Sequence, residues 1–166
     1  LHVTPGWRWR ELVDARSLRR WTPVIAGFTA LTAIVSFGLT WFLLPEGLLA
    51  LPLNATGLWI TIMLAYPFAS ALGQEVVFRP LFFRRYGDLF SNAAMALLAN
   101  AALFSAAHAF YGNWVAIVLT FFGGLGFGLA YQRSGSFPVV FAMHALAGQV
   151  IFTSGLGHFF YHGNAM

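Results

Sequence analysis

Long apolar runs separated by short polar connections dominate the chain. Each long run approaches the ~20 residues that a helix needs to cross a bilayer. They predict spans at about residues 24–44, 57–73 (continuing as helix to residue 86), 92–110, 114–132 and 137–153. The run at 48–54 is too short to cross and predicts a re-entrant or interfacial connection. The pattern therefore predicts an all-α fold, a polytopic transmembrane helix bundle of about five spans over residues 23–166.

Residues 1–22 differ from the rest because they mix charges with large apolar side chains. Five arginines alternate there with three tryptophans, which is typical of an amphipathic segment lying at the membrane interface. With five spans, segments 1–22, 84–90 and 133–136 fall on one side, and they hold every arginine outside the spans. Short cytoplasmic loops collect arginine, so the N-terminus is expected in the cytoplasm.

Composition supports a membrane protein and argues against nucleic acid as a partner. The chain is 59% hydrophobic and only 8% charged, far from the ~25% charged residues of soluble domains. All nine basic residues are arginines, and most lie at the margins of apolar spans, which fits membrane orientation. The chain contains no cysteine, which excludes disulfides and thiolate chemistry.

Small residues mark two spans as sites of close helix packing. Gly124 and Gly128 form a GxxxG pair in the fourth span, which favours close approach of a neighbouring helix over a phosphate-binding loop. The third span contains many alanines between residues 93 and 107, and we expect that helix at the centre of the bundle.

Four ionisable residues lie inside the spans: Glu75, Arg79, His108 and His144. A charge at the centre of a membrane helix costs roughly 2.5–3.5 kcal/mol even on insertion scales, so each needs a compensating partner or a function. Helix rise places Glu75, His108 and His144 at depths of about 16, 24 and 10 Å. These depths alone do not prove that the three residues meet.

Three interpretations of this set stay open. A buried carboxylate next to an imidazole can take a proton from water, while a second imidazole stabilises the oxyanion. Alternatively, Glu75 and Arg79 form an intrahelical ion pair, being four residues apart, and the histidines pack as neutral side chains. Glu75, His108 and His144 could also hold a divalent metal, but no HExxH motif is present, and we expect no cofactor.

Three motifs resemble those of the CPBP intramembrane proteases, the family of type II CAAX prenyl proteases and bacteriocin-immunity proteins. The family pattern is EExxxR, then FxxxH, then a later histidine often followed four residues on by Asn. Here the motifs are Gln74-Glu75-Val76-Val77-Phe78-Arg79, Phe104-Ser105-Ala106-Ala107-His108 and His144-Ala145-Leu146-Ala147-Gly148. The resemblance covers about residues 65–153 and implies a bacterial inner (plasma) membrane location.

Two departures from the pattern bear on chemistry. Gln74 stands where the family's water-activating glutamate is implied, and an amide cannot act as a general base. Gly148 stands where the resemblance implies an asparagine that supports the oxyanion. Either Glu75 or His108 acts as the base, or the chain binds substrates without cutting them. Pro80 follows the arginine and is expected to kink the helix.

The resemblance implies an intramembrane endopeptidase that hydrolyses a peptide bond in a membrane-associated protein or peptide. In this reading Glu75 is the general base, His108 orients the water, His144 stabilises the oxyanion and Arg79 sets the charge of Glu75. Gln74, Phe104 and Gly148 are expected to support the site or contact substrate. The rival expectation is a catalytically inactive membrane scaffold or immunity-like binding protein.

Overall fold

The structure is a computed structural model that describes Thr4 and residues 6–161. Residues 1–3, 5 and 162–166, which belong to the predicted interfacial segment and the tail, lie outside the described residues. Every regular element within the described part is helical. The longer helices are α1 (Leu18–Leu43), α3 (Thr56–Tyr66), α6 (Ala93–Ala106), α7 (Trp114–Ser134) and α8 (Phe137–Ser154).

Five helical stretches are long and apolar enough to cross a membrane, which confirms the predicted number of spans. They are Trp9–Leu43, Thr56–Leu89, Ala93–Tyr111, Trp114–Ser134 and Phe137–Ser154. The connection at 48–54 contains only the short helix α2 (Ala50–Asn54), which cannot cross a bilayer. The chain is therefore an integral membrane protein of the expected helical class.

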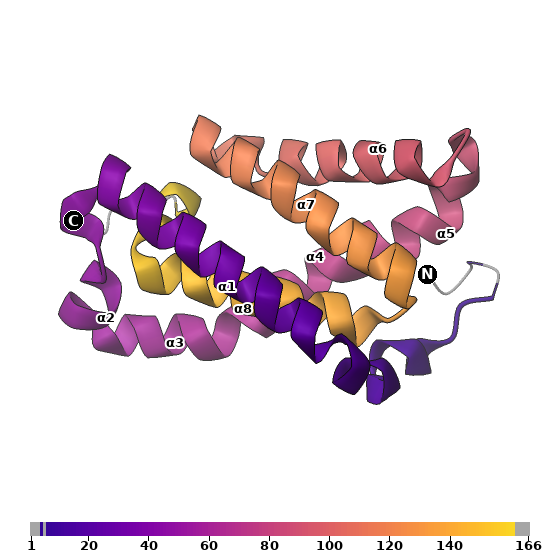
Figure 1. Cartoon of the computed structure of the whole chain (residues 1–166), viewed down its shortest axis with the longest axis horizontal. Coiled ribbons are helices and arrows are strands. Elements are labelled where there is room, and N and C mark those ends of the chain that lie inside the picture. The colour runs from indigo at the N-terminus through magenta and orange to yellow at the C-terminus, as the bar shows by residue number, and fades with distance from the viewer. Residues whose placement is uncertain (1–3, 5, 162–166) are drawn as a thin grey trace.

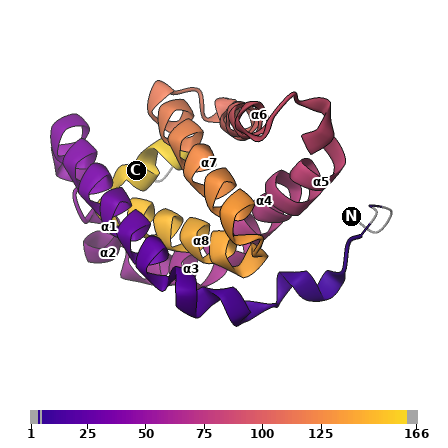
Figure 2. The ribbon, with the colours of Figure 1, turned by 45° about the vertical axis from the view of Figure 1, so that its right-hand side comes forward.

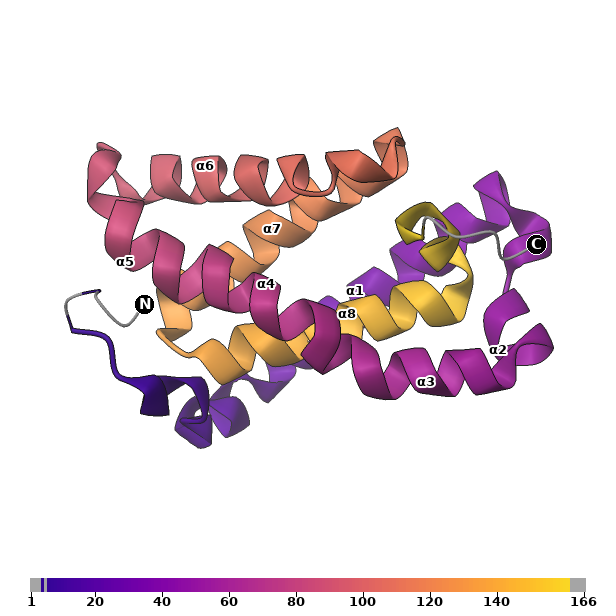
Figure 3. The ribbon, with the colours of Figure 1, turned by 180° about the vertical axis from the view of Figure 1, so that it is seen from behind.

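The second span is a composite helix with two wider turns. After α3 come a π-helical turn η4 (Pro67–Ala71), α4 (Leu72–Val76), a second π-helical turn η5 (Val77–Leu81) and α5 (Phe82–Tyr86), which follow one another in Figure 3. Pro67 and Pro80 lie in these turns. Where we expected a kink at Pro80, the helix widens locally. Such turns are rare and frequently mark functional sites, and here they flank Gln74 and Glu75.

Helix α8, not the alanine-rich α6, lies at the centre of the bundle. It packs against α1, α3, α4 and α7, whereas α6 lies at one edge and packs mainly on α7 (Figures 1 and 2). The expectation of a central third span is therefore wrong. Its alanines allow close packing on one face only, while Leu98 and Leu103 on the same helix remain about half exposed.

The GxxxG prediction in α7 is confirmed by the contacts of its two glycines with α6. A Cβ added at Gly124 would lie 3.1 Å from Ala101 Cα, and one added at Gly128 would lie 2.6 Å from Leu97 Cδ1. The absence of both side chains lets the two helices approach closely. This packing fixes the position of Phe104 and the C-terminal end of α6, where His108 follows.

The buried apolar core lies where α1, α7 and α8 meet. Its largest members are Ile25, Phe104, Phe127, Tyr131, Val139, Val140 and Met143. Because these side chains come from four separate helices, they hold the helices that carry the site in one fixed arrangement.

Side-chain caps define where α6 and α7 begin. Asn92 Oδ1 accepts from Met95 N at 2.9 Å, and Asn113 Oδ1 accepts from Ala116 N at 2.9 Å. Gly135 and Gly155 end α7 and α8 with φ values of 62° and 103°, a conformation that favours glycine. The Asn113 cap begins α7 soon after α6 ends, and Gly135 ends α7 shortly before α8 begins.

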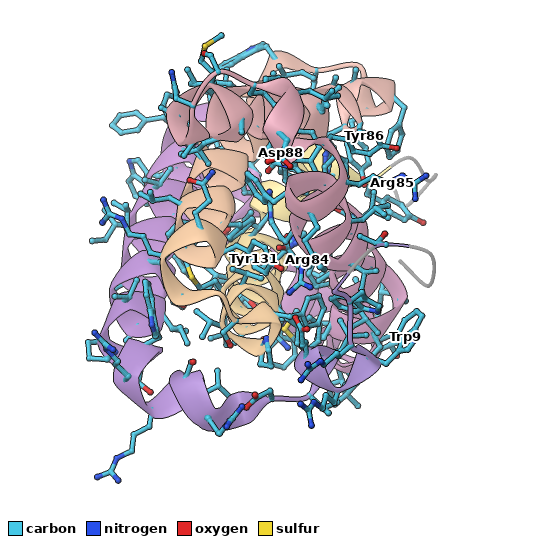
Figure 4. All side chains as sticks on the ribbon, turned by 90° about the vertical axis from the view of Figure 1, so that its right-hand side faces the viewer. Trp9, Arg84, Arg85, Tyr86, Asp88 and Tyr131 are labelled. Atoms are coloured by element: carbon cyan, nitrogen blue, oxygen red, sulfur yellow. The ribbon has the colours of Figure 1, made fainter. Side chains whose placement is uncertain are left out.

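Arg84 and Arg85 of α5 lie at the same end of the bundle as the arginine-rich N-terminal segment (Figure 4), as the five-span prediction requires. Arg84 in α5 donates to Gly6 O at 3.0 Å, pairs with Glu11 Oε2 and lies over the Trp7 ring at 5.3 Å. Figure 4 shows Arg84, Arg85 and Tyr131 at this end together with Trp9. The N-terminal segment is thus tied to α5. That this end faces the cytoplasm stays a prediction.

Candidate active site

Glu75 is fully buried in α4, and both of its carboxylate oxygens have partners. Arg79 Nε donates to Glu75 Oε2 at 2.8 Å, one helical turn further along the same segment. His144 Nδ1 in α8 lies 2.8 Å from Glu75 Oε1. The predicted ion pair between Glu75 and Arg79 is confirmed, and the carboxylate also joins two helices that lie far apart in the sequence.

Arg79 is also fully buried and is held by groups from α6 and α7. Its guanidinium donates to Asn100 Oδ1, and Asn100 Nδ2 in turn donates to Phe78 O at 2.7 Å. The guanidinium carbon lies 5.2 Å from the Phe104 ring centroid and 5.7 Å from that of Phe127. Aromatic faces stabilise a desolvated cation. The charge of Arg79 is therefore compensated by a carboxylate, an amide and two rings.

His144 is held at both ring nitrogens and on one face. Its Nδ1 contacts Glu75, and its Nε2 lies 3.0 Å from the Tyr66 hydroxyl oxygen at the end of α3. The Phe127 ring stacks on the imidazole with centroids 4.8 Å apart and planes 17° apart. A carboxylate at one nitrogen fixes the ring orientation and directs the other nitrogen. The ring of His144 also lines the cavity described next.

His108 follows the C-terminal end of α6 and is held by the backbone of its own helix. Its Nδ1 lies 2.7 Å from Phe104 O. Because a carbonyl oxygen can only accept, Nδ1 carries the hydrogen, and the neutral ring then has its lone pair on Nε2. The Phe104 ring lies between the two histidines, with its centroid 4.8 Å from His108 and 5.6 Å from His144.

A cavity of about 320 Å³ brings the polar groups together. Gln74, His108, His144 and Tyr66 line it, whereas Glu75 and Arg79 do not. The remaining walls come mainly from α1, α7 and α8 and are largely apolar: Phe28, Leu31, Val35, Leu119, Phe122, Phe127, Ile151, Phe152 and Phe160. The site is therefore a mostly hydrophobic chamber with polar groups at one side, a common form of ligand pocket.

Gln74 presents an amide, not a carboxylate, to this cavity. Its Nε2 donates to Ser70 Oγ at 3.0 Å, while its Oε1 is buried and has no partner within the described part of the chain. Leaving a buried acceptor unpaired costs about 1–3 kcal/mol. Glu75, the next residue, points away from the cavity and into the buried ion network. The two neighbours therefore have separate surroundings.

Gly148 lies one turn after His144 and packs against Tyr66. A Cβ built at Gly148 would overlap the Tyr66 ring and hydroxyl. Phe104 and Gly148 both line the cavity, and their supporting roles stay predictions. The structure thus brings Glu75 to His144, and Gln74, His108, Phe104 and Gly148 to the same cavity as His144.

Sequence reasoning missed Tyr66, Asn100 and Phe127. Tyr66 contacts His144 from 78 positions away in the chain, and no spacing rule connects them. Tyr66 did not stand out, since many side chains inside the runs carry hydroxyl groups. Asn100 gave a signal, because its amide lies in the middle of the third apolar run. Such residues in lipid need partners.

The metal alternative gains no support from the geometry of the described residues, where no three His, Asp or Glu side chains converge as a metal site. Glu75 and His144 contact each other, but Arg79 occupies the other carboxylate oxygen.

Five candidate membrane-crossing helices around one set of buried ionisable residues define a polytopic membrane protein with an intramembrane polar site. A family model described as type II CAAX prenyl endopeptidase Rce1-like matches residues 53–149, more than half of the chain. The chain belongs to this family, which confirms the resemblance found in the motifs. No curated protein and no solved structure gave a significant match. The match includes every predicted site residue and leaves α1 outside.

Proposed function

We propose that the protein is an intramembrane endopeptidase in which His108 is the general base. The observation that carries this proposal is the position of His108 on the cavity, with Nδ1 bound to Phe104 O and Nε2 left as the basic nitrogen. Glu75 was the other candidate, but both of its oxygens are engaged and it does not line the cavity. Gln74 lines the cavity but has no basic group.

The proposed reaction begins with a water molecule bound beside His108. His108 Nε2 removes a proton from this water as its oxygen attacks the peptide carbonyl carbon, and a C–O bond forms. The carbonyl oxygen becomes an oxyanion, which His144 stabilises from the same cavity. His108 then gives its proton to the leaving nitrogen as the C–N bond breaks. The products are a carboxylic acid and an amine.

Glu75 acts in this proposal as a positioning residue. Its Oε1 fixes His144 through Nδ1, and its Oε2 neutralises Arg79. Loss of the carboxylate would therefore impair the site through His144 and not through removal of the base. The unpaired Gln74 Oε1 could accept a hydrogen bond from the reacting water, which would help to orient it.

The proposed substrate is a membrane-associated protein or peptide, reached from the lipid phase. The cavity walls are mostly apolar and include Leu31 and Phe122, which are more than half exposed on the outer surface of α1 and α7. The family description names CAAX prenyl endopeptidase activity. A farnesylated peptide with a C-terminal CAAX sequence is therefore the first substrate to test.

A binding protein without catalysis is the second candidate, and Gln74 is the observation that favours it. An amide occupies the cavity-facing position next to Glu75, where a carboxylate would supply a stronger base. Gln74→Glu separates the two candidates. If the wild type cleaves at a measurable rate and the rate of Gln74→Glu differs from it by less than tenfold, the endopeptidase is supported. If only Gln74→Glu cleaves, the binding protein is supported.

The deciding experiment uses the full chain in liposomes of phosphatidylethanolamine and phosphatidylglycerol. The substrates are internally quenched peptides, farnesylated and unfarnesylated, anchored in the same bilayer. We expect His108→Ala to reduce cleavage by about 10²-fold or more, the usual contribution of a general base. His158→Ala is the matched control, because His158 is exposed and outside the cavity. Equal rates for His108→Ala and the wild type would refute the assignment.

We also propose that residues 1–22 lie at the cytoplasmic membrane interface, in a bacterial inner membrane. The ties from Arg84 to Gly6 and Glu11 support a segment that stays next to the bundle. Labelling of single cysteines at Val13 and Leu53 in sealed, oriented vesicles tests the orientation, since both residues are exposed and belong to opposite predicted sides.

A further inference from the structure

The Tyr66 hydroxyl is a polar group of the cavity that the proposed reaction has not yet used. It lies 3.0 Å from His144 Nε2 and has no other hydrogen-bond partner among the described residues. Tyr66 is the last residue of α3, directly before the π-helical turn that begins at Pro67. It also lines the same cavity as His108.

Orientation of His144 does not require this hydroxyl. Glu75 already holds Nδ1, and the Phe127 ring stacks on one face of the imidazole. A phenylalanine at position 66 would fill the same volume without bringing a hydroxyl into an apolar surrounding. Burying a hydroxyl costs free energy unless its hydrogen bonds are satisfied. The hydroxyl is the partner of His144 Nε2, but the position of the ring is already fixed without it.

Gly148 makes room for the Tyr66 ring. A Cβ at this position would overlap the ring and its hydroxyl. Gly148 follows His144 by one turn on the same face of α8, so the phenol occupies the space next to His144 Nε2 that a side chain at position 148 would fill. The glycine and the tyrosine together place one O–H group beside the imidazole.

The hydrogen count shows what this group can do. When both nitrogens of His144 carry hydrogens, Nδ1 donates to Glu75 and Nε2 donates to the Tyr66 oxygen. The single hydrogen of the Tyr66 hydroxyl is then free to donate elsewhere, while Glu75 Oε1 remains the acceptor for Nδ1. An acceptor in the cavity next to both groups would receive this hydrogen bond.

We propose that Tyr66 is a catalytic residue that donates a hydrogen bond to the oxyanion of the tetrahedral intermediate. In this arrangement His144 supports the oxyanion through Tyr66, because its Nε2 hydrogen is directed to the Tyr66 oxygen. The position of the Tyr66 ring depends on Gly148. This assignment rests on the proposed endopeptidase function. The hydroxyl is held in a largely apolar chamber, where a fixed donor stabilises developing negative charge more strongly than in water.

The test compares Tyr66→Phe with the wild type in the liposome assay, using the farnesylated quenched peptide. We expect kcat to fall by about 10²–10³-fold, the usual effect of removing one oxyanion donor, with KM within about twofold because the lost bond forms only in the transition state. Tyr86→Phe, at the exposed end of α5, is the matched control and should keep the wild-type kcat.

Two further variants separate the hydroxyl from the ring. Gly148→Ala should displace the phenol from His144 and lower kcat although the hydroxyl is still present. Tyr66→Ala combined with Gly148→Asn replaces the ring by an amide donor near His144, and we expect it to be at least tenfold faster than Tyr66→Ala alone.

The outcomes are distinct for the two proposals. A kcat for Tyr66→Phe within twofold of the wild type overturns the Tyr66 assignment and leaves the endopeptidase proposal standing. A higher KM with unchanged kcat also overturns it, because the hydroxyl would then contact the ground-state substrate. If the wild-type protein cleaves neither the farnesylated nor the unfarnesylated peptide, the endopeptidase proposal and the Tyr66 assignment are both refuted.

Discussion

Arg79→Met should destabilise the protein severely because it leaves the buried Glu75 carboxylate without its cation. Both side chains are fully buried, and Arg79 Nε lies 2.8 Å from Glu75 Oε2. The same change removes the donor to Asn100 Oδ1. Removing one partner of a buried pair costs about 3–5 kcal/mol, because the remaining charge stays desolvated. Methionine preserves a long side chain, so the volume of the site changes little.

Arg84→Met is the matched control for this prediction. Arg84 also pairs with a glutamate, Glu11, but the two side chains are 30% and 29% exposed. Exposed ion pairs contribute about 0–1 kcal/mol because water and salt screen them. The two variants therefore make the same chemical change in two surroundings. The difference between their losses of unfolding free energy measures the effect of burial on the ion pair.

The free energy of unfolding can be measured by titrating dodecyl sulfate into mixed micelles and following circular dichroism. We expect Arg79→Met to lose at least about 2 kcal/mol more than Arg84→Met. The double variant Glu75→Gln with Arg79→Met should be more stable than Arg79→Met alone, since no buried charge remains unpaired. If the double variant is no more stable, the loss comes from packing and the electrostatic reasoning is refuted.

Two further predictions concern packing and capping. Gly124→Ala should cost about 1–3 kcal/mol of unfolding free energy in the same titration, since its Cβ would lie 3.1 Å from Ala101 Cα, whereas Gly123→Ala meets only the Phe127 ring at 3.6 Å and should be nearly neutral. Equal losses would contradict the close approach of α6 and α7. Asn113→Ala should lose more stability than the ~1 kcal/mol expected for Asn92→Ala, because Asn113 caps α7 and also donates to Phe159 O at 2.9 Å; similar losses would show that this second bond contributes nothing.

The helical class and the number of spans could be predicted because hydrophobic runs report directly on crossing length. The Glu75–Arg79 pair could be predicted as well, because residues four apart share one face of a helix. The close packing of α6 on α7 followed from Gly124 and Gly128. Each of these properties depends only on residues within one segment.

The cavity could not be predicted because it depends on how each helix is rotated about its axis. Successive residues on a helix point about 100° apart, so only one of Gln74 and Glu75 can face the cavity. The rotation is set by contacts with α8 and by the π-helical turns, which the sequence does not reveal. The central position of α8 was missed for a related reason. The many alanines of α6 show that a neighbouring helix can pack closely on it, but they do not show how many neighbouring helices do so.

The π-helical turn at Val77–Leu81 also has a consequence for insertions and deletions. Each such turn holds an additional residue compared with a regular helix, so deletion of Leu81 would shorten the turn to α geometry. Because the wider turn covers about the same rotation with one more residue, α5 would keep its direction, whereas deletion of Phe83 within the regular helix α5 would rotate the residues after it by about 100°. Arg84 would then turn away from Glu11 and the N-terminal segment. The turn thus places one additional residue between the polar site and the arginine-rich surface, while each end of the second span still faces its own partners.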